Sequence, residues 1–281
     1  MKKKIWVIKL GGGFLQNEAS VSSLMLAIKD LLAVGFGIVI IHGGGKQADS
    51  MQMKLGIPIK KINGRRITDK KTLDILKMIY KGVVNSDLVS AALKAGIAGF
   101  GMTGMDGKIL VCERRPVQKI TDQKSGEEKR VDFGFVGDIK SFDGRLLSYL
   151  LDSGYLPVIA CLSADEKGQV LNINADTMAA AVACYMKAER LIFISDVEGI
   201  KKDRESSAFF KKLSLSQAEV MIREKKITDG MIPKIENVSR ALNGGIGSIQ
   251  IMGALNGKKE WMDGFINQSF GTVVYGGKYD K

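Results

Sequence analysis

The chain has 281 residues, 45% apolar and 26% charged, a composition that is typical of a folded globular protein and excludes an intrinsically disordered one. Lysine and arginine total 42 against 30 acidic residues, an excess that suits a small anionic substrate; the basic residues are dispersed and predict no nucleic-acid partner. No apolar run is long enough to span a bilayer, which favours a cytoplasmic protein without a membrane partner.

The first elements predict a strand-helix-strand unit. Residues 3–10 ("KKIWVIKL") and 35–42 ("GFGIVIIH") are short apolar runs rich in strand-forming residues, and a glycine triplet follows each. Between them, residues 21–35 have apolar side chains at helical spacing and end at a glycine. Such a crossover joins parallel strands and places helices on the faces of the sheet.

The middle of the chain continues this pattern after an interruption. Residues 86–96 predict an amphipathic helix, and Asp-Gly and Ser-Gly turn signals within residues 105–113 and 117–138 predict hairpins. Strand-helix-strand alternation then returns over residues 155–195.

The last third predicts two helices and two further strands. Ser214 and Gln217 form a capping box, and Pro233 stands at the start of a second helix. Residues 248–253 and 271–276 complete the sheet. Because no linker divides the chain, we expect one unit with two lobes, about residues 1–170 and 171–281, that meet across a cleft.

The two glycine triplets, residues 11–13 and 43–45, predict an anion-binding turn at each strand end. The second triplet fits a dinucleotide pattern, but the following segment, where a strand should end in a ribose-binding acidic residue, predicts only a poor strand. Gln47 occupies the position that Ser or Thr takes in a P-loop. Backbone N–H groups without neighbouring Cβ atoms can approach an anion closely. The alternative is that the glycines only permit tight turns.

Three charged residues are candidates for the same anion-binding site. Lys9 lies at a strand end, where α/β sheets bind their ligands. The alternative is that its apolar stem packs on the sheet edge and its ammonium group extends into solvent. Lys234 in a first helical turn opposes the helix dipole, so we expect an anion nearby. In "NINADT", Asn174 or Asp176 could cap a helix, and Asp176 could also pair with the lysines.

Three further residues have competing interpretations. His42, the one histidine, could be a general base, but a hydrogen-bonding role that fixes the turn is favoured. Asp196 and Gly199 directly follow an apolar strand, which suits either nucleotide contact or a plain turn.

Seven motifs in order over residues 9–242 carry a resemblance: "KLGG", "IHGGGK", "NGRRIT", "GFVGDI", "NINADT", "SDVEGI" and "TDGMIPKIENVSRAL". The sequence resembles the N-acetylglutamate kinases of the amino acid kinase family. The resemblance implies an α/β fold with an open, mainly parallel eight-stranded sheet in a three-layer αβα sandwich. It also implies that the N-terminal lobe binds the acyl amino acid and the C-terminal lobe binds ATP with Mg²⁺.

The resemblance also implies roles for individual residues. Lys9 and Lys234 would stabilise the transition state, and Asp176 would organise them. The N-acetyl-L-glutamate would be held by Gly44, Gly45, Arg66 and Asn172. Phosphate and nucleotide contacts would come from Gly11, Gly12, Ser195, Asp196, Val197, Glu198, Gly199, Lys226, Ile227 and Thr228. No metal ligand is expected from the protein, because the nucleotide would hold the Mg²⁺.

The implied reaction is attack of the substrate γ-carboxylate on the γ-phosphate of ATP, which yields N-acetyl-L-glutamyl 5-phosphate and ADP for arginine biosynthesis. A carboxylate is already ionised at pH 7, so no general base is needed. Three alternatives stay open: an acetylated or carrier-linked 2-aminoadipate, N-succinylglutamate, or an inactive sensor of amino acids or nucleotides. Because arginine-inhibited relatives carry an extra N-terminal helix and only four residues precede the first strand here, we expect a homodimer without arginine inhibition.

Overall fold

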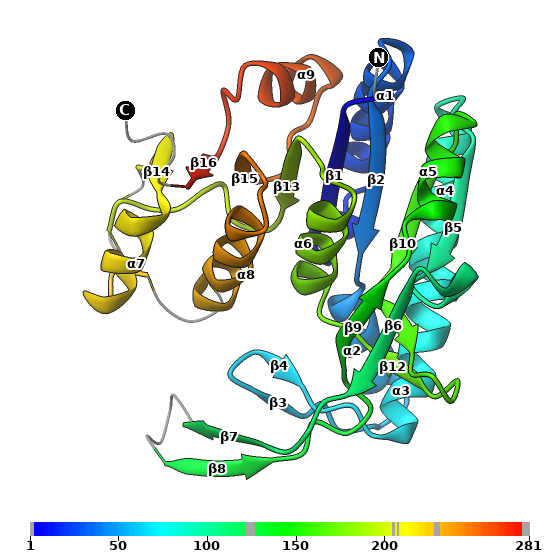
Figure 1. Cartoon of the computed structure of the whole chain (residues 1–281), viewed down its shortest axis with the longest axis vertical. Helices are drawn as coiled ribbons and strands as arrows, with labels where there is room; N and C mark the ends of the chain where they lie inside the picture. Colours follow the sequence, from blue (N-terminus) through cyan, green and yellow to red (C-terminus); the bar gives the residue numbers. More distant parts are fainter. Residues whose placement is uncertain (1–2, 122–126, 204–205, 207, 228–230, 277–281) are drawn as a thin grey trace.

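The computed structural model describes residues 3–121, 127–203, 206, 208–227 and 231–276. Its centre is an eight-stranded sheet (Figure 1). In spatial order the strands are β14 (Lys212–Ser214), β16 (Thr272–Tyr275), β15 (Ser248–Met252), β13 (Arg190–Ile194), β1 (Ile5–Leu10), β2 (Gly37–His42), β10 (Leu156–Ala160) and β5 (Gly99–Thr103). β15 and β16 run antiparallel and the other neighbouring pairs run parallel. The expected open, mainly parallel sheet is confirmed.

Both faces of this sheet are apolar and each is covered by helices, as the alternation of side chains along a strand requires. In β1, Trp6 and Ile8 pack into one core and Val7 into the other. The first core takes side chains from α1 (Glu18–Ala33), α4 (Asn85–Lys94) and α9 (Lys258–Ile266). The second takes them from α5 (Arg145–Asp152), α6 (Ala175–Tyr185), α7 (Leu215–Arg223) and α8 (Met231–Asn243). The expected three-layer arrangement is confirmed.

This alternation decides where the side chain of Lys9 goes. Lys9 lies two residues after Val7, so the two side chains share one face of the sheet. That face is the one that α6 and α8 cover. Lys9 also lies near the carboxyl end of β1, beside the first glycine triplet.

A smaller sheet and two hairpins lie beyond one end of the main sheet (Figure 1). The smaller sheet consists of β12 (Val170–Asn172), β11 (Leu162–Ala164), β6 (Leu110–Arg114) and β9 (Gly137–Phe142). The hairpins are β3 (Lys61–Ile62) with β4 (Arg65–Arg66), and β7 (Gln118–Thr121) with β8 (Glu128–Val131). The second hairpin confirms the prediction for residues 117–138, whose turn residues 122–126 lie outside the described chain.

The hairpin predicted for residues 105–113 is wrong. The Asp-Gly signal lies in the short 3₁₀ helix η3 (Asp106–Lys108), which connects β5 in the main sheet to β6 in the smaller one. Asp106 accepts a hydrogen bond from the backbone N–H of Thr103 (2.7 Å) and thereby closes the turn. β6 then pairs with β9, which follows much later in the chain.

The remaining helices follow local signals. The glycine turn after β2 leads directly into α2 (Gly45–Lys54). Asp69 caps α3 (Lys70–Leu76), which continues through the π-helical segment η2 (Lys77–Val84) into α4, the helix expected at residues 86–96. The predicted capping box of α7 is confirmed. Within the described chain, every helix is too short or too polar to cross a membrane.

Candidate active site

The two glycine turns lie next to each other. A Cβ atom on Gly12 would lie 3.3 Å from the backbone nitrogen of Lys46, and the Gln47 side chain donates to the Gly12 carbonyl oxygen (3.2 Å). Gly44 needs to be glycine, because its φ of +145° is unfavourable for other residues and a Cβ would meet the Tyr80 ring at 3.0 Å. The N–H of Gly11 donates to Ile194 (2.8 Å), so this amide is engaged in the sheet.

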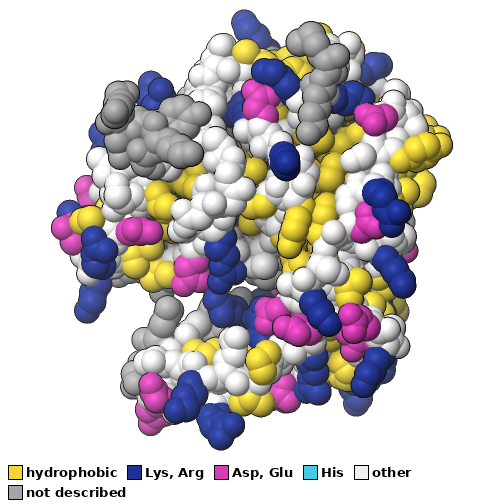
Figure 2. Space-filling model, viewed as in Figure 1, with side chains coloured by type: hydrophobic (Ala, Val, Ile, Leu, Met, Phe, Trp, Pro, Cys, Tyr) yellow, Lys and Arg dark blue, Asp and Glu magenta, His cyan; other side chains and the backbone are white. Residues whose placement is uncertain are grey.

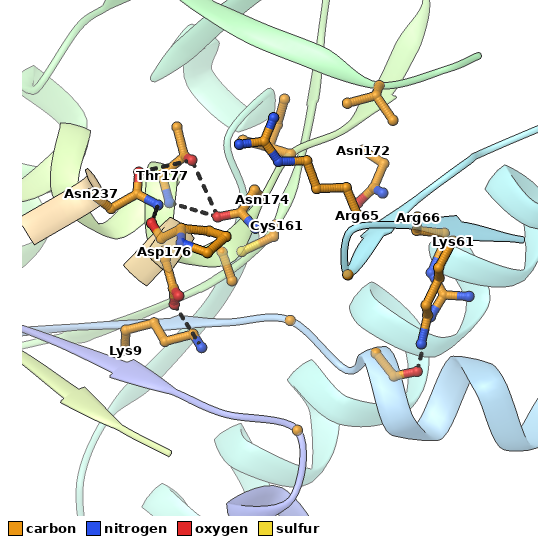
Figure 3. A pocket seen from close by; sticks show the side chains of 18 of the residues that line it. Lys9, Lys61, Arg65, Arg66, Cys161, Asn172, Asn174, Asp176, Thr177 and Asn237 are labelled. Carbon is orange, nitrogen blue, oxygen red and sulfur yellow. Dashed lines mark hydrogen bonds and ion pairs between the residues drawn. The ribbon is translucent and has the colours of Figure 1, made fainter. Parts of the chain in front are cut away.

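Lys9 of β1, Asp176 of α6 and Lys234 of α8 come together near the glycine turns, and Figure 3 shows the contact between Lys9 and Asp176. The Lys9 ammonium lies 2.8 Å from one carboxylate oxygen of Asp176, and the Lys234 ammonium lies 3.0 Å from the other. Their side chains are only 12%, 16% and 10% exposed. We refer to these three residues as the Lys–Asp–Lys trio, and their expected pairing is confirmed.

The trio carries a surplus positive charge. Burial alone would raise the pKa of Asp176, but the ammonium groups of Lys9 and Lys234 outweigh it and hold the pKa well below its usual range. Burial lowers the pKa of Lys234, and the Asp176 carboxylate opposes that change. With both lysines protonated the net charge is +1, in a place where solvent screens it weakly. An anion is the ligand that this charge favours.

A hydrogen-bond chain between α6 and α8 sets the position of Lys234. Asn174 caps α6 by accepting from the N–H of Thr177 (2.9 Å), so the capping alternative for Asn174 is confirmed. The Thr177 hydroxyl donates to Asn237 (3.1 Å), whose amide donates to the Pro233 carbonyl (2.8 Å). Sequence reasoning missed Asn237, although its spacing of three residues from Lys234 places both on one helix face.

A pocket of about 600 Å³ opens beside the trio, and Figure 2 shows a hollow at the lower left with lysine and arginine side chains at its inner end. The expected substrate residues Gly44, Gly45, Arg66 and Asn172 all line this pocket. Lys9, Asp176 and Gly12 line it too. The structure therefore brings together residues from both predicted lobes.

Arg66 is a fixed cation in the wall of this pocket. Its guanidinium donates to Asp49 and Gln52, both at 2.6 Å, and to the Gly45 carbonyl at 3.1 Å. The Asn63–Gly64 turn of the β3–β4 hairpin, in which both residues have positive φ, brings Arg66 back toward α2. A buried, hydrogen-bonded guanidinium of this kind is prepared to bind a carboxylate.

Other pocket residues were missed by sequence reasoning. Tyr80 contributes a buried ring from η2, and burial raises the pKa of its hydroxyl to about 12. The hairpins and their flanks contribute further polar side chains, namely Lys61, Asn63, Arg65, Arg115 and Gln118. A π-helical segment is frequent at functional sites, but no local sequence pattern marked it here.

The expected nucleotide residues divide into two groups. Those at 195–199 follow β13 and adjoin the first glycine triplet, where a Cβ on Gly11 would lie 3.2 Å from the Cα of Ser195. Asp196 pairs with Lys46, and Val197, Glu198 and Gly199 continue the same loop. In the other group, Lys226 pairs with Glu224 and the Ile227 side chain is buried in the core. Thr228 lies outside the described residues.

His42 has the structural role that was favoured for it. Its ring is fully buried, with Nδ1 2.9 Å from the Gly43 carbonyl oxygen and Nε2 2.9 Å from the Asn85 side-chain amide. The carbonyl requires a proton on Nδ1 and the amide requires none on Nε2, which assigns a neutral ring. Burial lowers the pKa of His42 to about 4. These hydrogen bonds hold the ring against the second glycine turn, which is the structural role.

We predict a pH-dependent loss of stability from this histidine. The unfolded chain binds the proton near pH 6.5 and the folded chain only near pH 4, so stability is complete above pH 6.5 and falls by about 3 kcal/mol as the pH drops to 4. NMR titration of the single histidine measures the folded pKa. Urea unfolding of the His42→Asn variant at both pH values isolates this contribution. A folded pKa above 6 would contradict the prediction.

The sequence and the overall fold are similar to those of known proteins. The profile of the amino acid kinase family matches residues 4–253. The acetylglutamate kinase of Methanocorpusculum labreanum is 38% identical over 275 residues, covering 97% of this chain and 91% of its own, and that of Sorangium cellulosum is 39% identical over 272 residues, covering 95% and 93%. The crystal structure of smu.665 from Streptococcus mutans UA159 superimposes with a TM-score of 0.75 at 28% identity, covering 96% of this chain and 98% of that one. The chain belongs to the amino acid kinase family.

Proposed function

We propose that this protein transfers the γ-phosphoryl group of ATP to the γ-carboxylate of N-acetyl-L-glutamate. The observation that carries the proposal is the Lys–Asp–Lys trio, two members of which, Lys9 and Asp176, line a pocket together with Arg66 and residues of both glycine turns. Relatives that are 33–39% identical over nearly the whole chain are named acetylglutamate kinases.

The chemistry requires the site to hold two anions together. A γ-carboxylate oxygen attacks the γ-phosphorus with its own electron pair, the bond from that phosphorus to the β,γ-bridging oxygen breaks, and ADP leaves with those electrons. No proton moves. Lys9 and Lys234 would neutralise charge that develops on the transferred group, while the Gly12 and Gly44 turns would approach its oxygens. Asp176 would keep the two ammonium groups apart and aligned.

We propose that Mg²⁺ enters with the nucleotide and is held mainly by its phosphates, where it would neutralise charge. The acidic residues beside the glycine turns support this view, because Asp176 is engaged by two lysines and Asp196 by one. Among the described residues, no group of three or more His, Cys, Asp and Glu side chains is arranged to hold a metal. The loop at 195–199 adjoins the first glycine turn, which supports its proposed role in nucleotide contact.

Trapping of the acyl phosphate with hydroxylamine tests the proposed reaction. The purified protein is incubated with ATP, Mg²⁺ and one acceptor at a time: N-acetyl-L-glutamate, N-succinyl-L-glutamate or N-acetyl-2-aminoadipate. We expect the hydroxamate with N-acetyl-L-glutamate to form with the highest kcat/KM. Preference for another acceptor would reassign the substrate, and no hydroxamate with any of them would favour the sensor alternative.

Arg66 provides a prediction about substrate binding. Arg66→Ala removes a buried cation from the pocket wall, so the KM for N-acetyl-L-glutamate should rise about 10- to 100-fold while kcat changes little. Arg66→Lys retains the charge but loses the forked hydrogen bonds to Asp49 and Gln52, and we expect an intermediate KM. Steady-state kinetics with each substrate varied in turn measures this. An unchanged KM in Arg66→Ala would exclude Arg66 from substrate binding.

We further propose a homodimer that forms at the β5 end of the sheet. β5 is the last strand in the sheet order, and the rings of Phe100 on β5 and Tyr155 before β10 pack edge to face at 6.2 Å. Leu93 on the adjoining α4 is also exposed. An apolar sheet edge of this kind favours association with another chain. Light scattering of the purified protein would give twice the chain mass, and a monomer mass at micromolar concentration would contradict the proposal.

A further inference from the structure

A second lysine–aspartate pair lies beside the Lys–Asp–Lys trio. Lys46 in the first turn of α2 reaches over the first glycine turn to Asp196, which follows β13, and its ammonium lies 2.6 Å from the carboxylate. The two side chains are 52% and 51% exposed. An ion pair this exposed adds only about 0–1 kcal/mol to the free energy of unfolding. Its contribution to stability therefore does not explain its presence.

The backbone beneath the pair is shaped to admit it. Gly13 has φ −71° and ψ −42°, a conformation that any residue adopts, so its backbone does not require glycine. A Cβ atom on Gly13 would instead overlap the Asp196 carboxylate and lie 2.7 Å from the Lys46 ammonium. The third glycine of "KLGGG" therefore gives room for the ion pair.

The charges of Lys46 and Asp196 are coupled to those of the Lys–Asp–Lys trio. The negative charge of Asp196 acts on Lys234, whose pKa it raises against the larger effect of burial. The charges of five side chains therefore alternate in sign, in the order Lys9, Asp176, Lys234, Asp196 and Lys46. Their net charge is +1. Lys46 also lies in the first turn of α2, where a cation opposes the helix dipole and a bound anion would relieve it.

Two buried polar atoms at the first glycine turn lack partners, and of the two the Ser195 hydroxyl is the one that could donate to an anionic ligand. The Ser195 hydroxyl and the Gln47 side-chain oxygen are buried and have no hydrogen-bond partner among the described residues. Gln47 follows Lys46, and Ser195 precedes Asp196, so both orphaned atoms adjoin the ion pair. Buried polar atoms without partners are rare in folded proteins and indicate a ligand or water that completes them.

We propose that Lys46 binds the phosphates of the nucleotide, and that its pair with Asp196 holds the ammonium over the first glycine turn until ATP arrives. This inference rests on the proposed kinase function. An ammonium group has three donors, so Lys46 can contact a phosphate oxygen and keep one hydrogen bond to Asp196. Asp196 acts as a positioning residue for Lys46, and the Ser195 hydroxyl can donate to the same phosphate.

Calorimetric binding of ATP, ADP and AMP to five variants tests the proposal. Lys46→Gln should weaken ATP and ADP binding about tenfold, weaken AMP binding less, and leave the KM for N-acetyl-L-glutamate unchanged. Asp196→Asn frees Lys46 and removes a negative charge, so ADP should bind at least as tightly as to the wild type. The double variant should resemble Lys46→Gln. As the matched control, Lys140→Gln removes an equally exposed lysine, paired with Glu166 at 3.0 Å, and should change no affinity.

The opposite outcomes are distinguishable. One opposite outcome is that both single variants weaken ADP binding equally and the double variant binds ADP no more weakly than either. In that case the ion pair only connects two loops, and Lys46 does not bind phosphate. Unchanged ADP affinity in Lys46→Gln also overturns the proposal. Lys46→Arg keeps the charge and should retain most of the affinity, which separates charge from folding effects. A wild-type protein that binds no nucleotide would contradict the proposed function itself.

Discussion

Lys234→Met should lower kcat for N-acetyl-L-glutamate phosphorylation by about 10²- to 10³-fold while the KM values change little. The reason is that the Lys234 ammonium would neutralise charge that is larger in the transition state than in the bound substrates. Methionine keeps the apolar stem that packs over the Phe193 ring, whose centroid lies 5.0 Å from the ammonium, so the packing at this position should be retained. Steady-state kinetics with saturating ATP measures the change.

Lys9→Met should have an effect of the same size, because Lys9 contacts the other oxygen of the same carboxylate. Lys140→Met, which removes a surface lysine far from this carboxylate in the sequence, is the control and should keep the wild-type kcat. A kcat within about twofold of wild type for either trio variant would remove that lysine from the mechanism.

Asp176→Asn is expected to separate nucleotide binding from turnover. The substitution keeps the shape of the side chain but leaves two buried ammonium groups without their shared carboxylate. Their stronger positive field should tighten ATP binding about threefold, while the loss of alignment lowers kcat about 10²-fold. The unpaired charges should also lower the free energy of unfolding by about 3 kcal/mol.

Three measurements on Asp176→Asn check this prediction: calorimetric ATP binding, steady-state kinetics and urea unfolding. Asn174→Asp, which changes a neighbouring residue of the same helix start and adds a charge, is a useful comparison for stability. Weaker ATP binding together with a wild-type kcat would show that Asp176 contacts the nucleotide rather than organising the lysines.

The central part of the fold could be predicted because its signals are local. The apolar strands, the glycine turns and the amphipathic helices each appear within about ten residues. Lys9 illustrates how far such reasoning reaches, because its place at the strand end indicated a ligand site, and alternation along β1 explains why it faces α6 and α8. The capping box at Ser214 is equally local.

The errors and omissions involve contacts between distant segments. The Asp-Gly signal after β5 resembled a hairpin turn, but β6 pairs with β9 in another sheet, and nothing near Asp106 reveals that partner. Tyr80 and Arg65 enter the pocket because η2 packs beside α2 and the β3–β4 hairpin is bonded to Asp49 of α2, a tertiary arrangement without a local pattern. The engagement of the Gly11 amide by Ile194 likewise depends on pairing with β13.

The central position of β1 constrains how the site can close around two substrates. β1 pairs in parallel with β13 on one side and β2 on the other, so the strands of the two predicted lobes share one uninterrupted ladder of backbone hydrogen bonds. A hinge that opened between the halves would have to break that ladder, at a high enthalpic cost. A rearrangement on substrate binding that kept this ladder intact would hold β1, and the glycine turn that follows it, in register with β13 and β2.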